Sequence, residues 1–389
     1  MKIIHTGDWH IGKQVNGFHM TEDQAFVMEQ VFEIIEEEKP EAFVIAGDLY
    51  DRSVPPIEAV ELLNRALNKI VRDLNTPVIA LAGNHDGNER LEFASELLTN
   101  SGLHIGGLIK RQCKKVVLQD GHGPVNFYLI PYAPPAVVRE LFEDSAIKTH
   151  DDAMRKIIES IHEEMDVNER NVAVAHGYIT YRSDKAKEEC DLEFSDSEIG
   201  GIDLINASYF DRFNYTALGH LHGPQKVGSD KIRYSGSLLK YSFSEVNQKK
   251  GLTIVEVSED GSVHVRLKAF KPKRDFRILK GKMDDLLKEE VYTLGNREDY
   301  IKVVLTDEGE LIDPVAKIKG TYPYFMELQR ENKIAREKAT NIAADFRDKT
   351  RLELFNDFYK DMKGEECSDE ARRLMEDIIH EIEREGDGL

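Results

Sequence analysis

Apolar and polar positions recur along the chain with two periods, and together they predict layers of strands and helices. Six short apolar runs bounded by glycine, proline or asparagine are typical of buried strands. They lie at residues 2–6, 42–46, 78–82, 125–130, 172–175 and 215–218. Between the first of these runs, residues 21–38 and 57–74 repeat apolar side chains at three- and four-residue steps, as amphipathic helices do. This alternation predicts an α/β fold in which helices cover sheets.

Two further groups of elements follow the last of these strands. The first group consists of short strand-like segments with tight turns, at residues 232–234, 252–257 and 263–267, and predicts a second sheet packed on the first. A composition shift at Lys271-Pro272 introduces the second group, which predicts a small α/β domain. Its expected helices lie at residues 282–288 and 312–319, and its expected strands at residues 300–305 and 324–329.

The C-terminal segment, beyond a charged connector at residues 330–350, carries two apolar helical stripes. The first stripe contains Leu352, Phe355, Phe358, Tyr359 and Met362. The second, for which Ser368 is a suitable N-cap, contains Ala371, Leu374, Met375, Ile378, Ile379 and Ile382. The two helices either pack on each other as a hairpin or dock on the helices of a partner, and the pattern leaves both interpretations open.

Composition places limits on the class of protein. A hydrophobic content of 41% and a charged content of 32% are typical of a soluble globular protein, and 389 residues predict two or three domains. No apolar run approaches the roughly 20 residues that cross a bilayer, and no signal peptide precedes the first strand. Three widely spaced cysteines form no redox or metal motif, so we expect a cytoplasmic protein.

The net charge of −20 argues against a protein that grips nucleic acid with its whole surface. The segment 266–282 is a local exception, because it holds eight lysines and arginines against the single acid Asp275. Two interpretations remain open for this segment. It follows a DNA backbone, or it is a solvated charged linker.

Short clusters of Asp, Asn and His stand at the ends of the predicted strands. Their potential metal donors are Asp8, His10, Asp48, Asn84, His176, His220 and His222, with His85 beside Asn84. Ligand sites gather beyond the carboxyl ends of sheet strands, so we expect these side chains to converge. Carboxylate, carboxamide and imidazole donors without thiolate favour Mn²⁺, Fe or Zn²⁺. Two cations about 3.5–4 Å apart need a shared anion, and Asp48 is the natural bridge.

Each cluster taken alone has an ordinary explanation. A single histidine at a strand end is usually a surface residue, and an aspartate there usually belongs to a turn. However, five of the 13 histidines fall in these clusters, each beside glycine or another donor. The joint pattern therefore predicts a shared centre that holds two divalent metal ions, a device that recurs in enzymes that cleave phosphate esters.

The order Asp-x-His, Gly-Asp, Gly-Asn-His-Asp, His and Gly-His-x-His resembles the calcineurin-like metallophosphoesterase superfamily. The resemblance implies a four-layer α/β/β/α sandwich over residues 1–268. It also implies that the two metals share Asp48 and that the residue matching His85 is a proton donor rather than a ligand. The remaining ligands would be Asp8, His10 and His222 for the first metal, and Asn84, His176 and His220 for the second.

Narrower motifs resemble the SbcD family, the nuclease subunits of bacterial SbcCD complexes. They are Gly-Asp-Leu-Tyr-Asp-Arg at 47–52, Tyr-Ser-Gly-Ser-Leu-Leu at 234–239, Tyr-Ser-Phe-Ser-Glu at 241–245, Asp-Tyr-Ile-Lys-Val at 299–303 and Tyr-Pro-Tyr at 322–324. The resemblance implies a DNA-facing capping domain at 269–335 and an SbcC-binding helical segment at 345–389. It further implies Mn²⁺-dependent 3′→5′ exonuclease and hairpin or single-strand endonuclease activity. The expected partners are DNA and an SbcC-type ABC ATPase, with two copies of each subunit, and a homodimer surface on the helices near 57–74 and 88–100.

The roles of Asp51 and Asp86 and two alternative functions remain open at this point. Asp51 stands where the archaeal relatives carry a second histidine, and Asp86 either orients the His85 imidazole or caps a turn. The same core also serves phosphatases and cyclic-nucleotide phosphodiesterases, which need no capping domain. A metal-free binding scaffold is the alternative from another class, although such scaffolds have lost ligand residues and every donor position is filled here.

Overall fold

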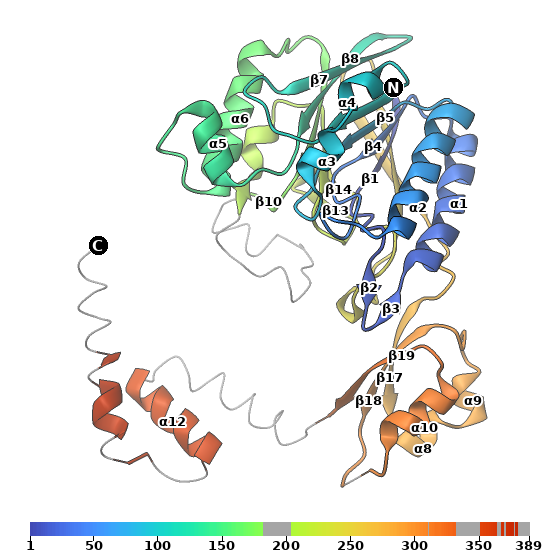
Figure 1. Ribbon diagram of the computed structural model, residues 1–389, viewed down its shortest axis with the longest axis vertical. Helices are drawn as coiled ribbons and strands as arrows, with labels where there is room; N and C mark the ends of the chain where they lie inside the picture. The colour runs from blue at the N-terminus through green and yellow to red at the C-terminus, as the bar shows by residue number, and fades with distance from the viewer. Residues whose placement is uncertain are drawn as a thin grey trace.

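The computed structural model describes residues 1–181, 204–309, 311–331 and 351–363, together with residues 367–368, 371–376 and 378–379. Its centre consists of two six-stranded sheets (Figure 1). The first sheet has the order β16 (Val263–Ala269), β15 (Gly251–Val257), β1 (Lys2–Thr6), β4 (Ala42–Ile45), β5 (Val78–Leu81) and β6 (Leu103–Gly106). The second has the order β13 (Gln225–Val227), β14 (Ser229–Tyr234), β12 (Tyr215–Gly219), β9 (Arg170–His176), β8 (Gly123–Ile130) and β7 (Lys114–Asp120).

Helices cover the outer faces of both sheets. The first sheet packs against α1 (Thr21–Glu38) and α2 (Ile57–Asn68), and the second against α5 (Pro135–Phe142) and α6 (His150–Glu164). The helix predicted for 57–74 continues past α2 as a π-helical turn, Lys69–Asp73. Shorter helical elements are α3 (Asn88–Glu92), α4 (Ser95–Thr99), η2 (Ala207–Phe210) and η3 (Phe243–Glu245). Two-residue strands form the hairpin β2 (Gln14–Val15) and β3 (Phe18–His19) and the pair β10 (Ile179–Thr180) and β11 (Ile205–Asn206).

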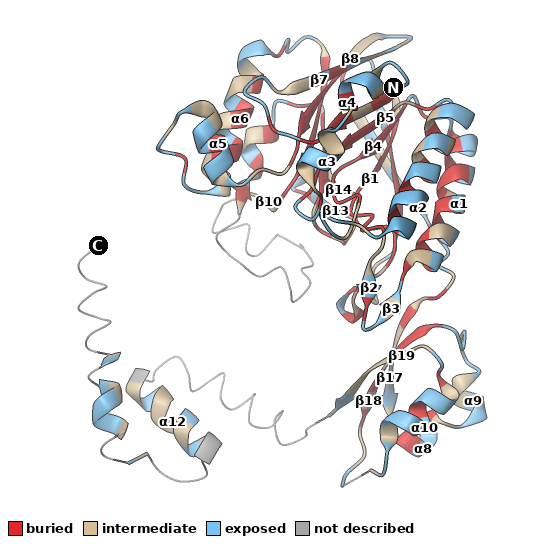
Figure 2. Ribbon diagram, in the orientation of Figure 1, coloured by how far each residue is buried: buried red, intermediate tan, exposed pale blue. Residues whose placement is uncertain are grey.

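Three apolar layers separate the four layers of secondary structure. Successive residues of a strand point to opposite faces, so Ile3 of β1 lies between the two sheets while Ile4 faces the helices. In β4, Val44 likewise lies between the two sheets and Phe43 faces the helices. Figure 2 shows buried residues along the sheets and on the inner sides of the helices. This arrangement confirms the predicted α/β/β/α sandwich.

The prediction that residues 232–267 form a second sheet of their own is wrong, because their strands divide between the two sheets of the sandwich. Strand β15 instead pairs antiparallel with β1 in the first sheet, where Lys2 lies opposite Glu256, and β16 extends that sheet at its edge. Strand β14 pairs parallel with β12 in the second sheet. Every residue of β15 except Glu256 is buried, so the strand needs cover on both faces. The need for burial therefore pairs β15 with the distant strand β1 and not with a strand nearby in sequence.

A small three-stranded parallel sheet follows the sandwich and forms a separate unit, here called the small domain. Its strands are β17 (Phe276–Gly281), β18 (Tyr300–Leu305) and β19 (Phe325–Arg330). Helices α8 (Met283–Leu286), α9 (Glu289–Tyr292) and α10 (Pro314–Thr321) accompany it, and its apolar side chains form a core of their own. This confirms the predicted small α/β domain. Strand β17 was not predicted, because Arg277 and Lys280 interrupt its short apolar run of Phe276, Ile278 and Leu279.

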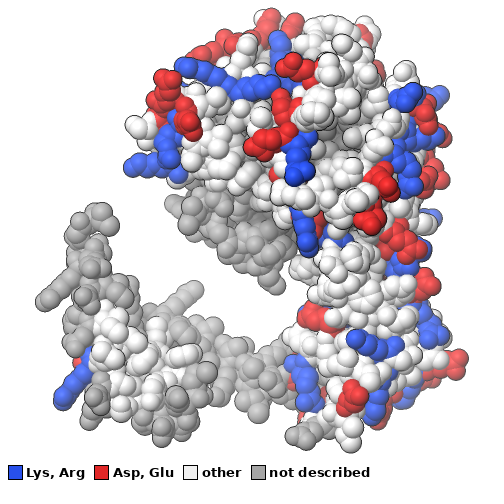
Figure 3. All heavy atoms as spheres, viewed as in Figure 1, with Lys and Arg blue, Asp and Glu red and all other residues white. Residues whose placement is uncertain are grey.

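Most cations of the basic segment 266–282 are paired with carboxylates. Six of its eight cations lie in ion pairs with carboxylates. They are Arg266, Lys268, Lys273, Arg274, Arg277 and Lys280. Four of these pairs reach acids of helix α1. On the face shown in Figure 3, acidic and basic side chains are interspersed. The local excess of positive charge is thus largely neutralised within the fold.

The C-terminal segment contains helix α12 (Arg351–Lys363), which carries the first predicted stripe. Residues 371–376 are also helical, and the Ser368 hydroxyl accepts a hydrogen bond from the backbone N–H of Ala371, as expected for an N-cap. The connector predicted at 330–350 lies outside the described residues from position 332 onward. In the part of the chain that the structure describes, no helix has both the length and the apolar character needed to cross a bilayer.

Candidate metal centre

The structure brings all seven predicted donors to one edge of the sandwich. In the first sheet β1, β4 and β5 run parallel, and their carboxyl ends carry Asp8 and His10, then Asp48, then Asn84. In the second sheet β9 ends at His176, which lies opposite Gly219 of the parallel strand β12. His220 and His222 follow that strand. Two sheets that place strand ends at the same edge thus supply the donors from both sides.

The backbone at this edge adopts conformations that few residues tolerate. Asp8, His10, Asp48 and His220 all have positive φ, at 51°, 45°, 51° and 108°. Non-glycine residues are destabilised in this region, and such residues concentrate at functional sites. Close approach adds a second constraint, because a Cβ atom at Gly83 would lie 2.1 Å from Asp48 Oδ1. The donors are therefore held in place by a strained and crowded backbone.

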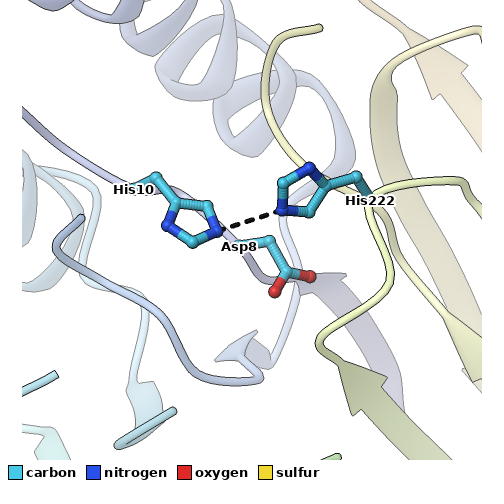
Figure 4. Close-up of side chains that lie close together, drawn as sticks. All are labelled: Asp8, His10 and His222. Atoms are coloured by element: carbon cyan, nitrogen blue, oxygen red, sulfur yellow. Dashed lines mark hydrogen bonds between the residues drawn. The ribbon is translucent and has the colours of Figure 1, made fainter. Parts of the chain in front are cut away.

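The first group of donors consists of Asp8, His10 and His222 (Figure 4). The His10 and His222 rings face each other with their Nε2 atoms 3.1 Å apart, and the Asp8 carboxylate lies beside them. Asp8 Oδ1 accepts a hydrogen bond of 2.8 Å from the backbone N–H of His220. Asp8 Oδ2 is buried and has no hydrogen-bond partner among the described residues. An unpartnered carboxylate oxygen beside two imidazole nitrogens fits a bound cation.

The second group consists of His176, Asn84 and His220. Asn84 Oδ1 lies 2.9 Å from His176 Nε2 and 3.2 Å from His220 Nδ1. The other ring nitrogen of His176, Nδ1, lies 2.8 Å from the carbonyl oxygen of Ala46, an acceptor to which it must donate. In a neutral ring Nε2 then carries a lone pair, so two acceptors face each other across a short gap. A cation between them would satisfy both.

Asp48 lies between the two groups. Its Oδ2 atom is 3.4 Å from His176 Nε2 and 3.6 Å from His10 Nε2. Its Oδ1 atom accepts a hydrogen bond of 2.9 Å from the backbone N–H of His85. One carboxylate oxygen therefore faces both donor groups, as the prediction of a shared anion requires.

The charges at this edge also favour bound cations. Burial raises the pKa of Asp8 to about 7, and the neighbouring Asp48 charge acts in the same direction. Burial opposes protonation of His176, but the charges of Asp48 and Asp8 raise its pKa to about 9. Asp8 and His176 thus hold protons more tightly than they would in free solution, whereas burial lowers the pKa of His10 to about 4 and that of His220 to about 3. A divalent cation would displace those protons and supply the positive charge that the carboxylates lack.

His85, the predicted proton donor, lies at the exposed margin of the centre. Its ring packs edge-on against His10 with centroids 4.8 Å apart, and its Nδ1 lies 3.0 Å from the backbone carbonyl of Asp51. The suggestion that Asp86 orients this imidazole is wrong. Asp86 instead accepts three backbone hydrogen bonds, from Leu49, Tyr50 and Gly83, and so caps the surrounding turns. The carbonyl of Asp51 orients His85.

The chain matches two protein-family models. Residues 1–224, more than half of the chain, match the model of the calcineurin-like phosphoesterases. The chain belongs to the calcineurin-like phosphoesterase family. Residues 272–363 match the SbcD_C model, described as the type 5 capsule protein repressor C-terminal domain. The two matches together confirm the predicted resemblance to the SbcD family, and family membership makes the chain a metal-dependent phosphoester hydrolase.

Solved structures show more distant likenesses. The protein TT1561 of Thermus thermophilus shares 9% identity at a TM-score of 0.41, covering 68% of this chain and 98% of that chain. A dimetal phosphatase from Danio rerio shares 11% identity at a TM-score of 0.35, covering 69% of this chain and 98% of that chain. Similarities this low carry no information about the substrate.

The phosphoesterase centre includes one carboxylate to which the sequence patterns assigned no role. Glu245, the last residue of the motif at 241–245, is buried, and its Oε1 atom lies 3.0 Å from His222 Nδ1. Its Oε2 atom pairs at 2.7 Å with Lys250 Nζ. Burial opposes ionisation of Glu245, but Lys250 and His222 lower its pKa to about 2. The carboxylate therefore accepts the Nδ1 proton and leaves Nε2 of His222 free to face the donor group.

Replacing Glu245 with glutamine should weaken metal binding about 10- to 100-fold, because His222 would lose the charged acceptor that fixes its tautomer. Titration calorimetry with Mn²⁺ measures this change. Glu256→Gln is the matched control, since Glu256 is an exposed residue of β15. An unchanged Mn²⁺ affinity in a folded Glu245→Gln variant would remove Glu245 from the centre.

Proposed function

We propose that this phosphoesterase is the DNA nuclease subunit of an SbcCD-type complex, with 3′→5′ double-strand exonuclease activity and single-strand or hairpin endonuclease activity. The observation that supports it most is the small domain, which matches the SbcD_C model and packs on α1 next to the donor edge. A phosphatase or cyclic-nucleotide phosphodiesterase has no need of such a domain. In this proposal the small domain acts as a capping domain that restricts which DNA structures reach the centre.

The donor residues divide between two cations, and we propose Mn²⁺ because the donors mix carboxylate, carboxamide and imidazole. When bound, two such cations lower the pKa of a water molecule toward neutrality and neutralise charge on the phosphoryl oxygens. Asp48 serves both positions, in keeping with the place of its Oδ2 atom between the two groups. Asp8, His10 and His222 would complete the first, and Asn84, His176 and His220 the second.

His85 is proposed as the general acid. With Nδ1–H donating to the Asp51 carbonyl, the Nε2 atom of the same ring carries a proton when the ring is the imidazolium cation, and this proton would pass to the departing 3′-oxygen of the DNA strand. The packing of the ring against His10 restricts its rotation. Asp48 contributes here as well, because its Oδ1 atom holds the backbone N–H of His85 and so fixes the turn that carries the imidazole.

Substrate choice is the direct test of this function. The purified chain with Mn²⁺ should cleave an end-labelled DNA hairpin and degrade a blunt duplex from its 3′ ends. It should act far more slowly on a small aryl phosphate monoester. An SbcC-type ATPase added with ATP should stimulate cleavage. Rapid hydrolysis of the monoester without cleavage of either DNA would replace the nuclease proposal with a phosphatase.

An SbcC-type ABC ATPase is the proposed protein partner, docking on the C-terminal helices at 345–389. In support, Phe358 of α12 is 62% exposed, and Leu374 beyond it is 63% exposed. Phe358 belongs to the first stripe and Leu374 to the second, and exposed apolar side chains on amphipathic helices support a binding surface.

Deleting residues 345–389 should abolish association with the ATPase while sparing Mn²⁺-dependent cleavage by the isolated subunit. Co-purification of the two chains followed by gel filtration measures the association. Phe358→Asp in the full chain should weaken the association without removing the segment. Lys360→Asp on the same helix is its control. Undiminished co-purification of the truncated chain would refute the docking segment.

A homodimer of this chain, within an assembly of two nuclease and two ATPase subunits, is also proposed. The helices suggested for the dimer surface carry strongly exposed apolar side chains. Ile57 of α2 is 74% exposed, Phe93 is 81% exposed and Leu97 of α4 is 78% exposed. Isolated apolar residues at the surface are ordinary, but several on neighbouring helices support an interface. We further propose a cytoplasmic location, in keeping with the free thiols of Cys113 and Cys367.

A further inference from the structure

We propose that the first turn of α1 couples the docking of the small domain to the loop that carries His10, with Gln24 as the positioning residue of the loop and Asp23 as the contact to the small domain. This inference rests on the proposed role of His10 in metal binding. Neither residue carried a functional signal in the sequence.

Gln24 fixes the backbone around His10. The side chain is fully buried, and its Oε1 atom accepts a hydrogen bond of 3.1 Å from the backbone N–H of Gly12. Its Nε2 atom lies 2.8 Å from the carbonyl oxygen of His10 and 3.2 Å from that of Trp9. His10 and Gly12 both have positive φ, at 45° and 90°. A backbone in this region persists only where its surroundings hold it, and Gln24 supplies several of those contacts.

Tyr241 completes the support of this loop. Its hydroxyl donates a hydrogen bond of 2.6 Å to the carbonyl oxygen of Trp9 and lies 2.9 Å from Gln24 Nε2. Its ring packs edge-on against His10 and His222, with centroids 5.8 Å and 5.9 Å apart. Loss of the Gln24 contacts would therefore release the His10 backbone and also loosen the tyrosine that packs against both imidazoles.

Asp23, the residue before Gln24, holds the small domain. Its side chain is fully buried, and Oδ2 accepts hydrogen bonds from Arg274 Nη1 at 2.8 Å and from the Tyr300 hydroxyl at 2.9 Å. Arg274 also donates to the Tyr324 hydroxyl at 3.0 Å, and its guanidinium lies 4.5 Å from the centre of the Tyr324 ring. Tyr300 begins β18 and Tyr324 precedes β19, so these contacts fix the sheet of the small domain on α1.

The hairpin β2–β3 gives a second connection between the same two parts. It leaves the His10 loop after Lys13 and returns to α1 at Met20. Figure 1 shows it extending from the sandwich toward β17 and β19. Its Phe18 ring lies 5.9 Å from the Tyr300 ring and 5.8 Å from the Tyr324 ring. The small domain thus contacts the chain at the hairpin and again at the start of α1, at two points of the segment that leads from the loop to Gln24.

Neighbouring residues of a helix point about 100° apart, so Asp23 and Gln24 reach different partners from one rigid turn. A shift of the small domain moves Asp23 and Phe18, and the buried turn passes that movement to Gln24 and the His10 backbone. Coupling between two sites is reciprocal. Release of the small domain should therefore weaken metal binding at the His10 group, and metal binding should in turn tighten the contacts of the small domain.

Metal affinity and amide exchange of the full-length chain test the coupling without relying on catalysis. Titration calorimetry with Mn²⁺ should show that Gln24→Met weakens binding about 10- to 100-fold, as other residues that support metal ligands do. Arg274→Met, which leaves the centre untouched, should weaken it by at least about fivefold. In the double variant, Mn²⁺ affinity should fall by less than the product of the two single fold-changes. Glu29→Gln on the exposed face of α1 is the control and should bind Mn²⁺ as the unchanged protein does.

Hydrogen exchange provides the reciprocal measurement. Mn²⁺ should slow amide exchange in β18 of the unchanged protein, and this protection should disappear in Gln24→Met. Tyr300→Phe removes only one hydroxyl from Asp23, so it repeats the affinity test should Arg274→Met unfold. Unchanged Mn²⁺ affinity in folded Arg274→Met and Tyr300→Phe variants would overturn the coupling alone. Absence of Mn²⁺ binding by the unchanged protein would overturn the proposed metal centre together with the coupling.

Discussion

Replacing Asp48 with asparagine is expected to reduce metal-dependent hydrolysis by about 10³-fold or more, because in the proposed centre it removes the anion that both cations would share. Burial opposes ionisation of Asp48, but the charge of His176 and the neighbouring histidines hold its pKa well below the usual range, which favours the carboxylate. Asparagine keeps the shape and can still accept the hydrogen bond from the His85 backbone. The fold should therefore persist.

Two measurements make this prediction specific. Calorimetric titration should show weakened or lost binding of at least one Mn²⁺, and thermal unfolding in EDTA should show little change in the midpoint. Asp284→Asn, at an exposed position in the small domain, serves as the matched control for loss of one carboxylate. Full activity of the Asp48→Asn variant would mean that the two cations do not share this residue.

Replacing His85 with alanine will leave Mn²⁺ affinity nearly unchanged and reduce turnover on DNA about 10²- to 10⁴-fold, the usual contribution of a general acid. The expected loss depends on the leaving group. A DNA 3′-oxygen leaves poorly and needs a proton, whereas a nitrophenolate leaves without one. The variant should therefore lose much more activity on DNA than on a bis(nitrophenyl) phosphodiester.

The structure also allows a second role for His85, as a metal ligand. His10, Asp51 and His85 place their donor atoms within 4.8 Å of one another, so His85 could help to hold a cation. In that case His85→Ala would lose Mn²⁺ affinity, and activity would fall equally on both substrates. His122→Ala, at an exposed turn far along the sequence, controls for loss of an imidazole.

The basic segment shows why local charge is a weak guide to partners. Its eight cations left a DNA-facing track and a charged linker as open alternatives, and six of them lie in ion pairs, four with acids of α1. The acids of α1 are more than 200 positions away in sequence. Pairing over such a distance depends on how the small domain packs, and composition cannot reveal it.

The amino-acid pattern alone was sufficient to predict the strands that end in donors, the layered α/β class, the small domain and the identity of the seven candidate ligands. It was sufficient because burial imposes a period on each element and because metal donors belong to few residue types. Three-dimensional packing was needed to show that β15 joins the first sheet, that Glu245 holds His222, and that Asp23 and Gln24 connect the small domain to the His10 loop. These contacts join residues 14 to 254 positions apart, and neither the periodicity nor the composition of the sequence indicates which residues will meet. They exist because the fold buries polar groups that must find a partner, and the choice of partner is made by packing rather than by neighbouring sequence.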